Sequence, residues 1–431
     1  MKTKDIKNLL IALEEEIVLN ESEISRALFL DLGKSREEAI MTETGMVLKE
    51  LRSMIKNLKR YRKPKRIRNT ILNFRSKSFI YPEPWGHVLI VSPWNYPFNL
   101  SMIPLIGAIA AGNTVTLKTS SKSINTSRVI KKIVEDVFPD YICRVIFGGN
   151  SNAEVLNTKF DYIFFTGGLE TGRLFYEKAA RDMVPVTLEL GGKSPAFLLE
   201  SADLDLSARR IAFGKFLNAG QTCVAVDYCM CPRGKERELR LKILKYVRDF
   251  YGYDPIISRN LGKIISENDY TRLVETLESE DVKFKRDDRR LKIEPTVVIT
   301  DLNSPLMSRE IFGPILPIIP YDYKEKALDY IKSQKTPLAF YIFGSEKEAT
   351  EIASRMKFGG ASINDTMSHM VGDLPFGGMG ESGIGAYHGE YTFKTFVREK
   401  SVLVKKKWPD FNMRYPGKAS VELIKKIFKI K

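Results

Sequence analysis

A glycine-rich turn after an apolar run is the first feature of this sequence that could do chemistry. In the segment DYIFFTGGLETG, a strand-like run is followed by Gly167 and Gly168 and then by a helix-like stretch containing Gly172. Backbone N–H groups in such a turn can hold a pyrophosphate at the start of a helix. The turn lacks the GxGxxG spacing of the common dinucleotide fingerprint. Arg173 and Leu174 stand where a nucleoside-triphosphate loop needs Lys and Ser or Thr, so the sequence disfavours a kinase or ATPase.

Glu189 is a candidate general base. It lies between Leu188 and Leu190 and precedes the pair Gly191-Gly192. Apolar neighbours remove water from a carboxyl group, which raises its pKa toward the range where it can accept a proton at neutral pH. The alternative is a satisfied carboxylate at the end of a strand, which has no catalytic role.

Two other kinds of site are disfavoured. The three histidines, His87, His369 and His388, are scattered, and Cys229 with Cys231 forms a CxC pair, which is not a typical zinc-binding spacing. No metal site is therefore predicted, and we expect these two cysteines to point to one face of a strand as buried thiols. The segment GESGI has isoleucine where a GxSxG nucleophile elbow needs glycine.

Two kinds of apolar pattern predict the helices and strands that must position these residues. From residue 4 to 63, apolar residues recur every three or four positions, which predicts a layer of helices. After Pro84, short runs rich in valine and isoleucine alternate with helical stretches, which predicts an α/β fold with a parallel sheet covered on both faces. A second α/β block follows, with the change of domain near Leu190.

The 431 residues carry a net charge of +15, which lies mainly in two segments. Residues 56–69 hold eight basic and no acidic residues, and residues 400–431 hold ten basic and two acidic ones, so the remaining chain has a net charge of −1. That balance is typical of an ordinary enzyme, and no nucleic-acid partner is predicted. We interpret the first segment as a solvated helix end followed by an edge strand.

The second basic segment ends in an amphipathic pattern. Val421, Ile424 and Phe428 have helical spacing, with lysines beside them, so this helix could make a weak contact with an anionic membrane surface. The alternative is a terminal helix that is solvated or packed against a partner.

The cysteine count and the apolar runs favour a cytoplasmic protein. Four cysteines without paired spacing are typical of free thiols in a reducing compartment. Three consecutive glutamates from Glu14 interrupt the apolar core that a signal peptide would need. The longest apolar run, residues 102–111, is about half of the ~20 residues that a membrane-spanning helix requires.

Six motifs occur in an order that resembles the aldehyde dehydrogenase superfamily, and the AYHG ending resembles its class 3 branch. They are PWNYP from Pro93, GNTVTLKTS from Gly112, LELGGKSP from Leu188, GQTC from Gly220, EIFGPILP from Glu310 and PFGGMGESGIGAYHG from Pro375. The resemblance implies a Rossmann-like nucleotide-binding domain, an α/β catalytic domain and a small oligomerisation element. We assign residues 1–190 to the N-terminal helices and the NAD(P)-binding domain, with an oligomerisation hairpin at 60–82. Residues 191–390 would form the catalytic domain, and 391–431 the oligomerisation strand and basic tail.

The resemblance also implies catalytic roles. Cys223 would attack an aldehyde as a thiolate, because hydride leaves carbon readily only from a tetrahedral, oxyanionic intermediate. The side-chain amide of Asn95 and the backbone N–H of Cys223 would stabilise that oxyanion. Glu189 would then activate the water that hydrolyses the thioester.

By the same resemblance, NAD or NADP would be the cofactor. Gly167, Gly168 and Gly172 would approach its pyrophosphate, Lys118 its adenosine ribose and Glu310 its nicotinamide ribose, with Phe312 and Trp94 beside it. Tyr96 and His388 would line the entrance for substrate, and these groups favour an apolar aldehyde. The residues after Lys118 include no acid, so we expect the 2′-phosphate of NADP to be accepted.

The predicted function is NAD(P)-dependent oxidation of an aliphatic or aromatic aldehyde to the carboxylate by a homodimer. One alternative is a CoA-acylating relative, which would pass the same thioester to CoA and commonly lacks the base at the position of Glu189. The other is a non-catalytic protein that binds a membrane or a nucleic acid through its basic ends. Such a protein would be expected to have lost Cys223, Glu189 or Asn95, and all three are present.

Overall fold

The predicted helical layer is confirmed. The computed structural model describes residues 1–70, 73–148 and 151–430. Gly33, with a φ of 68°, ends the second helix, and the Ser35 hydroxyl caps the third by accepting a hydrogen bond from Glu38 N at 3.2 Å. The helices are α1 (Thr3–Leu19), α2 (Glu21–Leu32), α3 (Arg36–Ala39), the π-helix η1 (Ile40–Thr44) and α4 (Gly45–Tyr61).

The first large sheet has the strand order β16-β7-β6-β3-β4-β5. All neighbours are parallel except β16, which pairs antiparallel with β7. Because β3 lies between β6 and β4, the loops after β3 and β6 leave the same edge of the sheet at a switch point, where α/β folds bind ligands. The strands are β3 (His87–Val91), β4 (Thr114–Lys118), β5 (Cys143–Ile146), β6 (Tyr162–Thr166), β7 (Val186–Glu189) and β16 (Gly383–Ile384).

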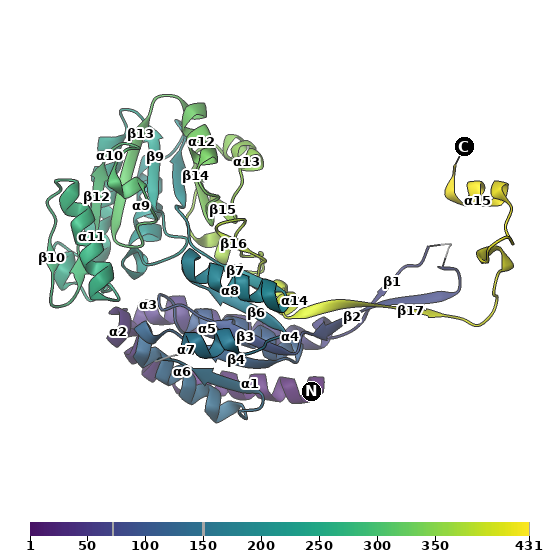
Figure 1. The fold of residues 1–431 in the computed structure, drawn as a ribbon. Helices are drawn as coiled ribbons and strands as arrows, with labels where there is room; N and C mark the ends of the chain where they lie inside the picture. The colour runs from purple at the N-terminus through teal and green to yellow at the C-terminus, as the bar shows by residue number, and fades with distance from the viewer. Residues whose placement is uncertain (71–72, 149–150, 431) are drawn as a thin grey trace. The chain divides into compact units, whose positions relative to one another are not determined.

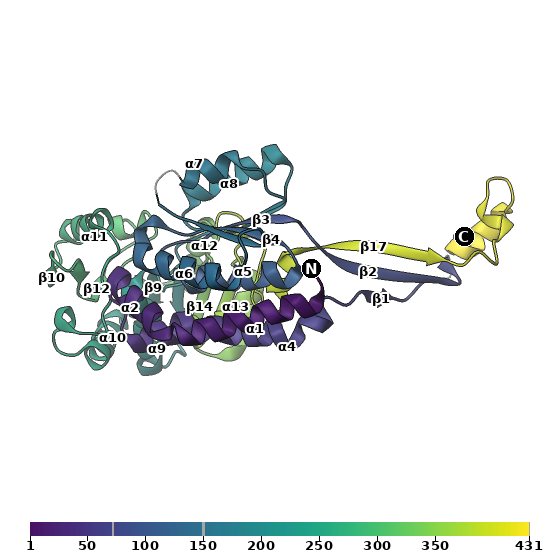
Figure 2. The ribbon, with the colours of Figure 1, turned by 90° about the horizontal axis from the view of Figure 1, so that it is seen from below.

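Helices cover both faces of this sheet, as the α/β prediction requires. In Figure 2, α8 lies on one side of the strands and α5 and α6 on the other, with α1 and α4 outside α5 and α6. Helices α6 and α8 are amphipathic, whereas every residue of α5 except Leu100 is buried. Their bounds are α5 (Asn99–Ala111), α6 (Ile124–Val137), α7 (Ser151–Asn157) and α8 (Leu169–Asp182).

The second large sheet, also visible in Figure 1, is parallel throughout and has the order β12-β13-β9-β8-β14-β15. Its strands are β8 (Pro195–Leu198), β9 (Tyr228–Pro232), β12 (Thr296–Ile299), β13 (Ile315–Tyr321), β14 (Ala339–Phe343) and β15 (Gly360–Ile363). Its helices are α9 (Leu204–Phe216), α10 (Glu236–Tyr251), α11 (Glu267–Ser279), α12 (Lys324–Ser333) and α13 (Glu346–Arg355), beside the hairpin β10 (Arg286–Asp287) and β11 (Lys292–Ile293). The α/β, Rossmann-like fold class is thus confirmed. The two-residue strand β16 belongs to the first sheet, although its residues lie in the block assigned to the catalytic domain. The sequence did not predict this pairing, because so short a strand leaves no periodicity.

The CxC pair behaves as predicted. Cys229 and Cys231 lie two positions apart on β9, so they point to the same face of the sheet. Both are fully buried in one hydrophobic cluster, and all four cysteines are free thiols.

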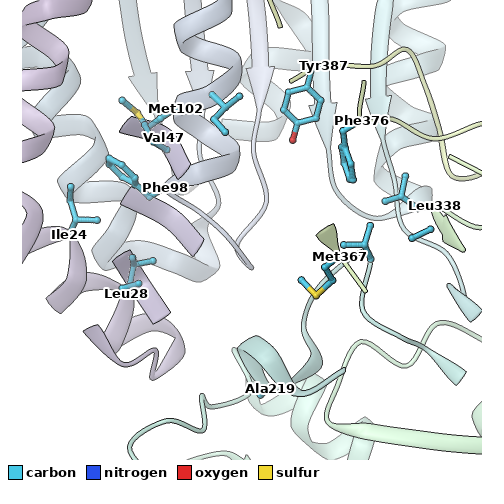
Figure 3. Packing of buried hydrophobic residues seen from close by; sticks show 14 of the residues in the cluster. Ile24, Leu28, Val47, Phe98, Met102, Ala219, Leu338, Met367, Phe376 and Tyr387 are labelled. Atoms are coloured by element: carbon cyan, nitrogen blue, oxygen red, sulfur yellow. The ribbon is translucent and has the colours of Figure 1, made fainter. Parts of the chain in front are cut away.

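Hydrophobic packing continues from the helical layer into the first sheet. Figure 3 shows Phe98, at the start of α5, close to Val47 of α4 and Met102 of α5. In the same view, Tyr387 lies beside Phe376, and their rings meet edge to face at 5.8 Å. The loops that carry the predicted site residues are therefore anchored in a continuous core.

Residues 62–83 and 399–431 form a separate compact unit. Its sheet has the order β1-β2-β17, in which β1 and β2 are antiparallel. Ile71 and Leu72, part of the segment predicted to be an edge strand, lie outside the described residues. The elements are β1 (Lys65–Ile67), β2 (Ser76–Pro84), β17 (Val397–Lys405), the short helix η8 (Asn412–Arg414) and α15 (Val421–Phe428). Among the described residues, no helix has both the length and the apolar content needed to cross a membrane.

Candidate active site

A cavity of about 570 Å³ brings most of the predicted site residues together. It is lined by the turn after β3, the ends of β6 and β7, the loop after α9 and the loop before β13. Its lining includes the three predicted catalytic residues and five of those predicted to hold the cofactor: Asn95, Glu189, Cys223, Trp94, Gly167, Gly168, Glu310 and Phe312.

Cys223 lies at the end of a strained loop. The short helix η4 (Leu217–Gly220) follows α9, and its residues Asn218 and Ala219 have positive φ angles of 53° and 51°. Gly220, at φ 75°, must be glycine, because a Cβ there would lie 2.2 Å from the carbonyl oxygen of Gly313. Strained backbone of this kind is typical of functional loops.

The surroundings of Cys223 favour the neutral thiol over the thiolate. Burial and, to a smaller extent, the nearby carboxyls of Glu310 and Glu189 outweigh the backbone N–H groups of Cys223 and Val224, and together they raise its pKa to about 12. A thiolate is the nucleophilic form, so attack on a carbonyl requires a proton acceptor in the same cavity.

Glu189 is the unusual carboxyl of the cavity. It ends β7, where its backbone oxygen accepts a hydrogen bond from Gly167 N at 3.0 Å, and its side chain is only 3% exposed. Neither of its carboxyl oxygens has a hydrogen-bond partner among the described residues. Burial raises its pKa well above the ordinary value of 4.5. An unpaired carboxyl with a raised pKa is suited to accept a proton from a thiol or from water.

Asn95 presents a side-chain amide to the cavity. Its Nδ2 donates to the carbonyl oxygen of Gln221 at 3.0 Å, in the loop that carries Cys223. The amide has two N–H groups, so the second is left for a ligand. Its own backbone oxygen accepts hydrogen bonds from Lys34 Nζ at 3.1 Å and from Asn218 Nδ2 at 2.9 Å. The donor is thus held from two directions.

The start of α8 fits an anionic group. Gly167, Gly168 and Leu169 line the cavity where this helix begins, and no side chain caps its first turn. The first N–H groups of a helix lack partners within the helix, so they can donate to a phosphate. A Cβ on Gly168 would meet no atom within 4 Å, which leaves open space for a ligand at this turn.

Glu310 is half-buried, and unlike Glu189 it has a hydrogen-bond partner, the N–H of Gly192. Burial and the charge of Asp227 outweigh the Gly192 N–H and the cations of Lys193 and Lys215, so the pKa of Glu310 is raised to about 8. A Cβ on Gly191 would lie 2.3 Å from its Oε2, so this carboxylate packs directly against the glycine pair. A held carboxylate suits the hydroxyls of a ribose.

Two aromatic side chains form another part of the lining. Trp94 and Phe312 meet edge to face, with ring centroids 5.4 Å apart. Phe312 has a φ of 51°, which is unusual for a bulky residue.

Four predicted site residues do not line this cavity. Gly172 packs α8 against the sheet, because a Cβ there would lie 2.7 Å from Leu190 Cδ2. Lys118 is buried at the end of β4, and burial lowers its pKa. The Tyr96 hydroxyl hydrogen-bonds with that of Thr222 at 2.7 Å. His388 is buried behind a lining residue, stacked on Phe376 at 5.2 Å, and burial lowers its pKa to about 4.

Residues 1–402 match the Aldehyde dehydrogenase family. The chain belongs to this family. It is an NAD(P)-dependent oxidoreductase that acts on aldehydes.

Two relatives and one solved structure illustrate the similarity. The 4,4'-diaponeurosporen-aldehyde dehydrogenase of Staphylococcus aureus is 41% identical, with 99% of this chain and 96% of that protein covered. The rat enzyme named "Aldehyde dehydrogenase, dimeric NADP-preferring" is 39% identical, with coverage of 91% and 88%. The structure described as the substrate-bound state of Staphylococcus aureus AldH superposes with a TM-score of 0.96 at 40% identity, covering 99% of this chain and 95% of that one.

The sequence did not single out several charged residues that support the site of this aldehyde dehydrogenase. Lys193 forms an ion pair with Asp227 and donates to the carbonyl oxygens of Leu306 and Arg309, so it holds the loop before Glu310. Lys193 lies within the motif LELGGKSP, so its position in that motif could have indicated a role at the site. Lys215 is fully buried, and burial lowers its pKa to about 8, but a lone lysine at the end of a helix gives no such indication.

Proposed function

We propose that this aldehyde dehydrogenase oxidises an apolar aldehyde to the free carboxylate through a thioester on Cys223, and that Glu189 is the general base. The observation that carries the proposal is the unpaired, buried carboxyl of Glu189 in the cavity that Cys223 also lines. A carboxyl with no structural partner costs stability, so a chemical role explains its presence better than a structural one.

The first step forms a thiohemiacetal. Cys223 loses its proton to a water molecule that enters the cavity, and the thiolate sulfur bonds to the carbonyl carbon. The electron pair of the C=O bond moves to oxygen, where the free N–H of Asn95 and the Cys223 backbone N–H donate to the oxyanion. Each such donor accelerates a reaction by about 10²–10³. When bound, NAD or NADP accepts the hydride that leaves carbon, and Cys223 is left with a thioester.

The second half releases the acid. Glu189 takes a proton from water, whose oxygen bonds to the thioester carbon, and the C–S bond breaks to return the thiolate of Cys223. The raised pKa of Glu189 suits this transfer, because a base works best when its pKa lies near the operating pH.

The residues present fit a dinucleotide. The uncapped start of α8 would hold the pyrophosphate, Glu310 the nicotinamide ribose and Lys118 the adenosine ribose. We propose that NADP is accepted beside NAD, because Ser121, and not an acid, stands three residues after Lys118. Lys122 does not offer a free charge to a 2′-phosphate, since its Nζ pairs with Asp269 at 2.8 Å.

An apolar substrate is supported by the lining of the cavity. Leu100, Leu338, Phe376 and Tyr387 add to the rings of Trp94 and Phe312. The Staphylococcus aureus relative is named for a diaponeurosporen aldehyde, which agrees with an apolar ligand. His388 and Tyr96 would act on the substrate only through the residues they contact.

A homodimer is proposed for the unit formed by residues 62–83 and 399–431. Leu403 and Val404 of β17 and Phe74 are all exposed there. Exposed apolar residues on a three-stranded sheet favour association with a second copy. Light scattering should give twice the chain mass for the parent and a smaller mass for Leu403→Lys.

The free thiols of all four cysteines support the predicted cytoplasmic location, because exposed or buried thiols persist in a reducing compartment. Cell fractionation tests this directly: the protein should be recovered with the cytosol or loosely with membranes.

One assay separates the three functions that the sequence left open. Purified protein is given hexanal or benzaldehyde with NAD or NADP, with and without CoA, and both reduced cofactor and acyl product are measured. We expect turnover to the free acid that does not depend on CoA. An acyl-CoA product would favour the acylating alternative, and no turnover with any aldehyde would favour a binding protein.

A further inference from the structure

A buried ion pair lies behind the oxyanion donor, outside the cavity. Lys34 follows α2 and Glu43 belongs to the π-helix η1, and both side chains are 0% exposed. Lys34 Nζ lies 2.5 Å from Glu43 Oε1 and donates to the backbone oxygen of Asn95 at 3.1 Å. Removing two charges from water is costly, so a pair in this place calls for an explanation beyond stability.

Glu43 extends the contact to the other end of the same turn. Its Oε2 accepts hydrogen bonds from the backbone N–H groups of Phe98 at 3.1 Å and Asn99 at 2.8 Å, at the start of α5. The ion pair therefore holds the turn that carries Asn95 at both ends. A carboxylate at a helix start is favourable, and π-helices often occur at functional sites.

A neighbouring acid of the same helical layer holds the loop of the nucleophile. Glu38 Oε1 accepts a hydrogen bond from Asn218 N at 2.9 Å, in the strained segment before Cys223. Asn218 Nδ2 in turn donates to the backbone oxygen of Asn95 at 2.9 Å. The N-terminal helices thus contact both loops whose separation decides whether the donor meets the oxyanion.

We propose that the Lys34–Glu43 pair is a positioning device for the oxyanion donor: it fixes the backbone of Asn95 so that the Asn95 amide points at the carbonyl oxygen of an aldehyde bound to Cys223. This inference rests on the proposed role of Asn95. The pair touches neither substrate nor cofactor, so it acts through the turn that carries Asn95, where Lys34 Nζ also lies 3.9 Å from the centroid of the Tyr96 ring. A displacement of about 1 Å can cost about 10²-fold in rate, which makes such support effective.

A double-mutant cycle tests the proposal. The single-turnover rate of cofactor reduction is measured with hexanal in the parent, Lys34→Met, Asn95→Ala and the combined variant. We expect a loss of about 10² or more for Asn95→Ala and of about 10- to 100-fold for Lys34→Met. Because Lys34 acts through Asn95, the combined variant should be within about twofold of Asn95→Ala. NAD binding, measured by fluorescence quenching, should be unchanged in all four.

Two further variants keep the test decisive. Lys34→Met/Glu43→Gln removes both charges and repeats the cycle if an unpaired Glu43 prevents folding. Lys178→Met is the control, because the buried Lys178 side chain pairs with the exposed Asp182 at 2.7 Å on α8, away from both loops. It should lower the melting temperature without changing the single-turnover rate.

Three results would overturn the inference. A folded Lys34→Met/Glu43→Gln variant with the parent rate would show that the pair does not act on the reaction. Losses that multiply in the combined variant would show that Lys34 acts independently of Asn95. A parent-like rate for Asn95→Ala would instead refute the oxyanion role on which the inference rests.

Discussion

Charged side chains occur under opposite conditions in the catalytic cavity and in the C-terminal tail. In the cavity, Glu189 and Glu310 are desolvated, and burial raises the pKa of each carboxyl. In the tail, Lys425 and Lys426 of α15 and Lys429 just after it are exposed. The apolar residues Val421, Ile424 and Phe428 beside them are exposed as well. Burial changes when a group gains or loses a proton, which is what catalysis needs. Exposure leaves a charge available for attraction to another surface.

The two cavity carboxyls sharpen the contrast further. Glu310 accepts a hydrogen bond from the Gly192 N–H and lies near the charges of Lys193 and Lys215, whereas Glu189 has no hydrogen-bond partner among the described residues. A held carboxylate suits binding, and an unheld one suits proton transfer. We therefore expect the largest loss of turnover on substitution of the nucleophile Cys223 and a smaller loss for the base Glu189. Substitution of Ser121 beside the cofactor and removal of the tail should have smaller effects still.

The largest effect is expected for Cys223→Ala. The thiol forms the covalent bond, whereas α8 and Glu310 hold the cofactor, so turnover should fall by at least about 10³-fold while NAD binding stays nearly unchanged. Steady-state assays and fluorescence titration measure the two properties. Turnover above a few per cent of the parent would refute the nucleophile assignment.

Glu189→Gln should slow the steady state by about 10²–10³-fold, since the amide cannot accept a proton from water. A burst of reduced cofactor in the first turnover should remain, because acylation precedes the step that needs the base. Stopped-flow absorbance measures both phases. An abolished burst would instead place Glu189 in the activation of Cys223, which the raised pKa of that thiol makes a serious competitor.

The sequence predicted the fold class and the residues that line the cavity, but it did not predict the buried charged residues that hold their loops in place. Asn95, Glu189 and Cys223 stand within short motifs, so the resemblance could locate each of them. The α/β alternation likewise followed from short apolar runs, such as those of β3 and β6. These features are local in the chain, and local patterns survive in a sequence.

The supports could not be predicted because they depend on contacts distant in the chain. Lys34 reaches Asn95 across 61 positions, and Glu38 reaches Asn218 across 180. In the sequence, Lys34 and Glu43 belong to an ordinary amphipathic helical layer, where charges are usually solvated. His388 was placed at the substrate entrance by its motif, but the structure buries its ring behind Phe376.

Ser121→Glu places a carboxylate that is neither desolvated, as in the catalytic cavity, nor remote from the cofactor, as in the tail. Ser121 is exposed near the end of β4, so a carboxylate there would be solvated but close to the adenosine ribose. We expect kcat/KM with NADP to fall by about tenfold through repulsion of the 2′-phosphate, with NAD within about twofold of the parent. Ser121→Gln is the uncharged control. Equal losses with both cofactors would show that the position does not select between them.

The burial of Glu189 also predicts a stability effect. The pKa of Glu189 is higher in the folded than in the unfolded chain, so its proton stabilises the fold fully below the ordinary pKa of 4.5. This stabilisation falls as pH rises above 4.5 and is lost above the folded pKa. Glu189→Gln cannot ionise. Its melting temperature relative to the parent should therefore be about 1–3 °C higher at pH 8 than at pH 5. A difference independent of pH would mean that folding does not raise the pKa of Glu189.

The smallest effect on turnover is expected for removal of residues 416–431. No residue that lines the cavity follows Tyr387 in the chain, so hexanal oxidation should stay within about twofold of the parent. We propose that α15 rests weakly on an anionic lipid surface, because Val421, Ile424 and Phe428 share one side of the helix and lysines occupy the other. Sedimentation with phosphatidylcholine vesicles containing phosphatidylserine should then detect the full chain but not the truncated one, and salt should weaken binding. Ile424→Ser/Phe428→Ser keeps every charge and should lose most of the binding if the apolar face inserts. Equal sedimentation of full and truncated chains would refute a role for α15, and no sedimentation of either would mean that its exposed charges stay in solvent.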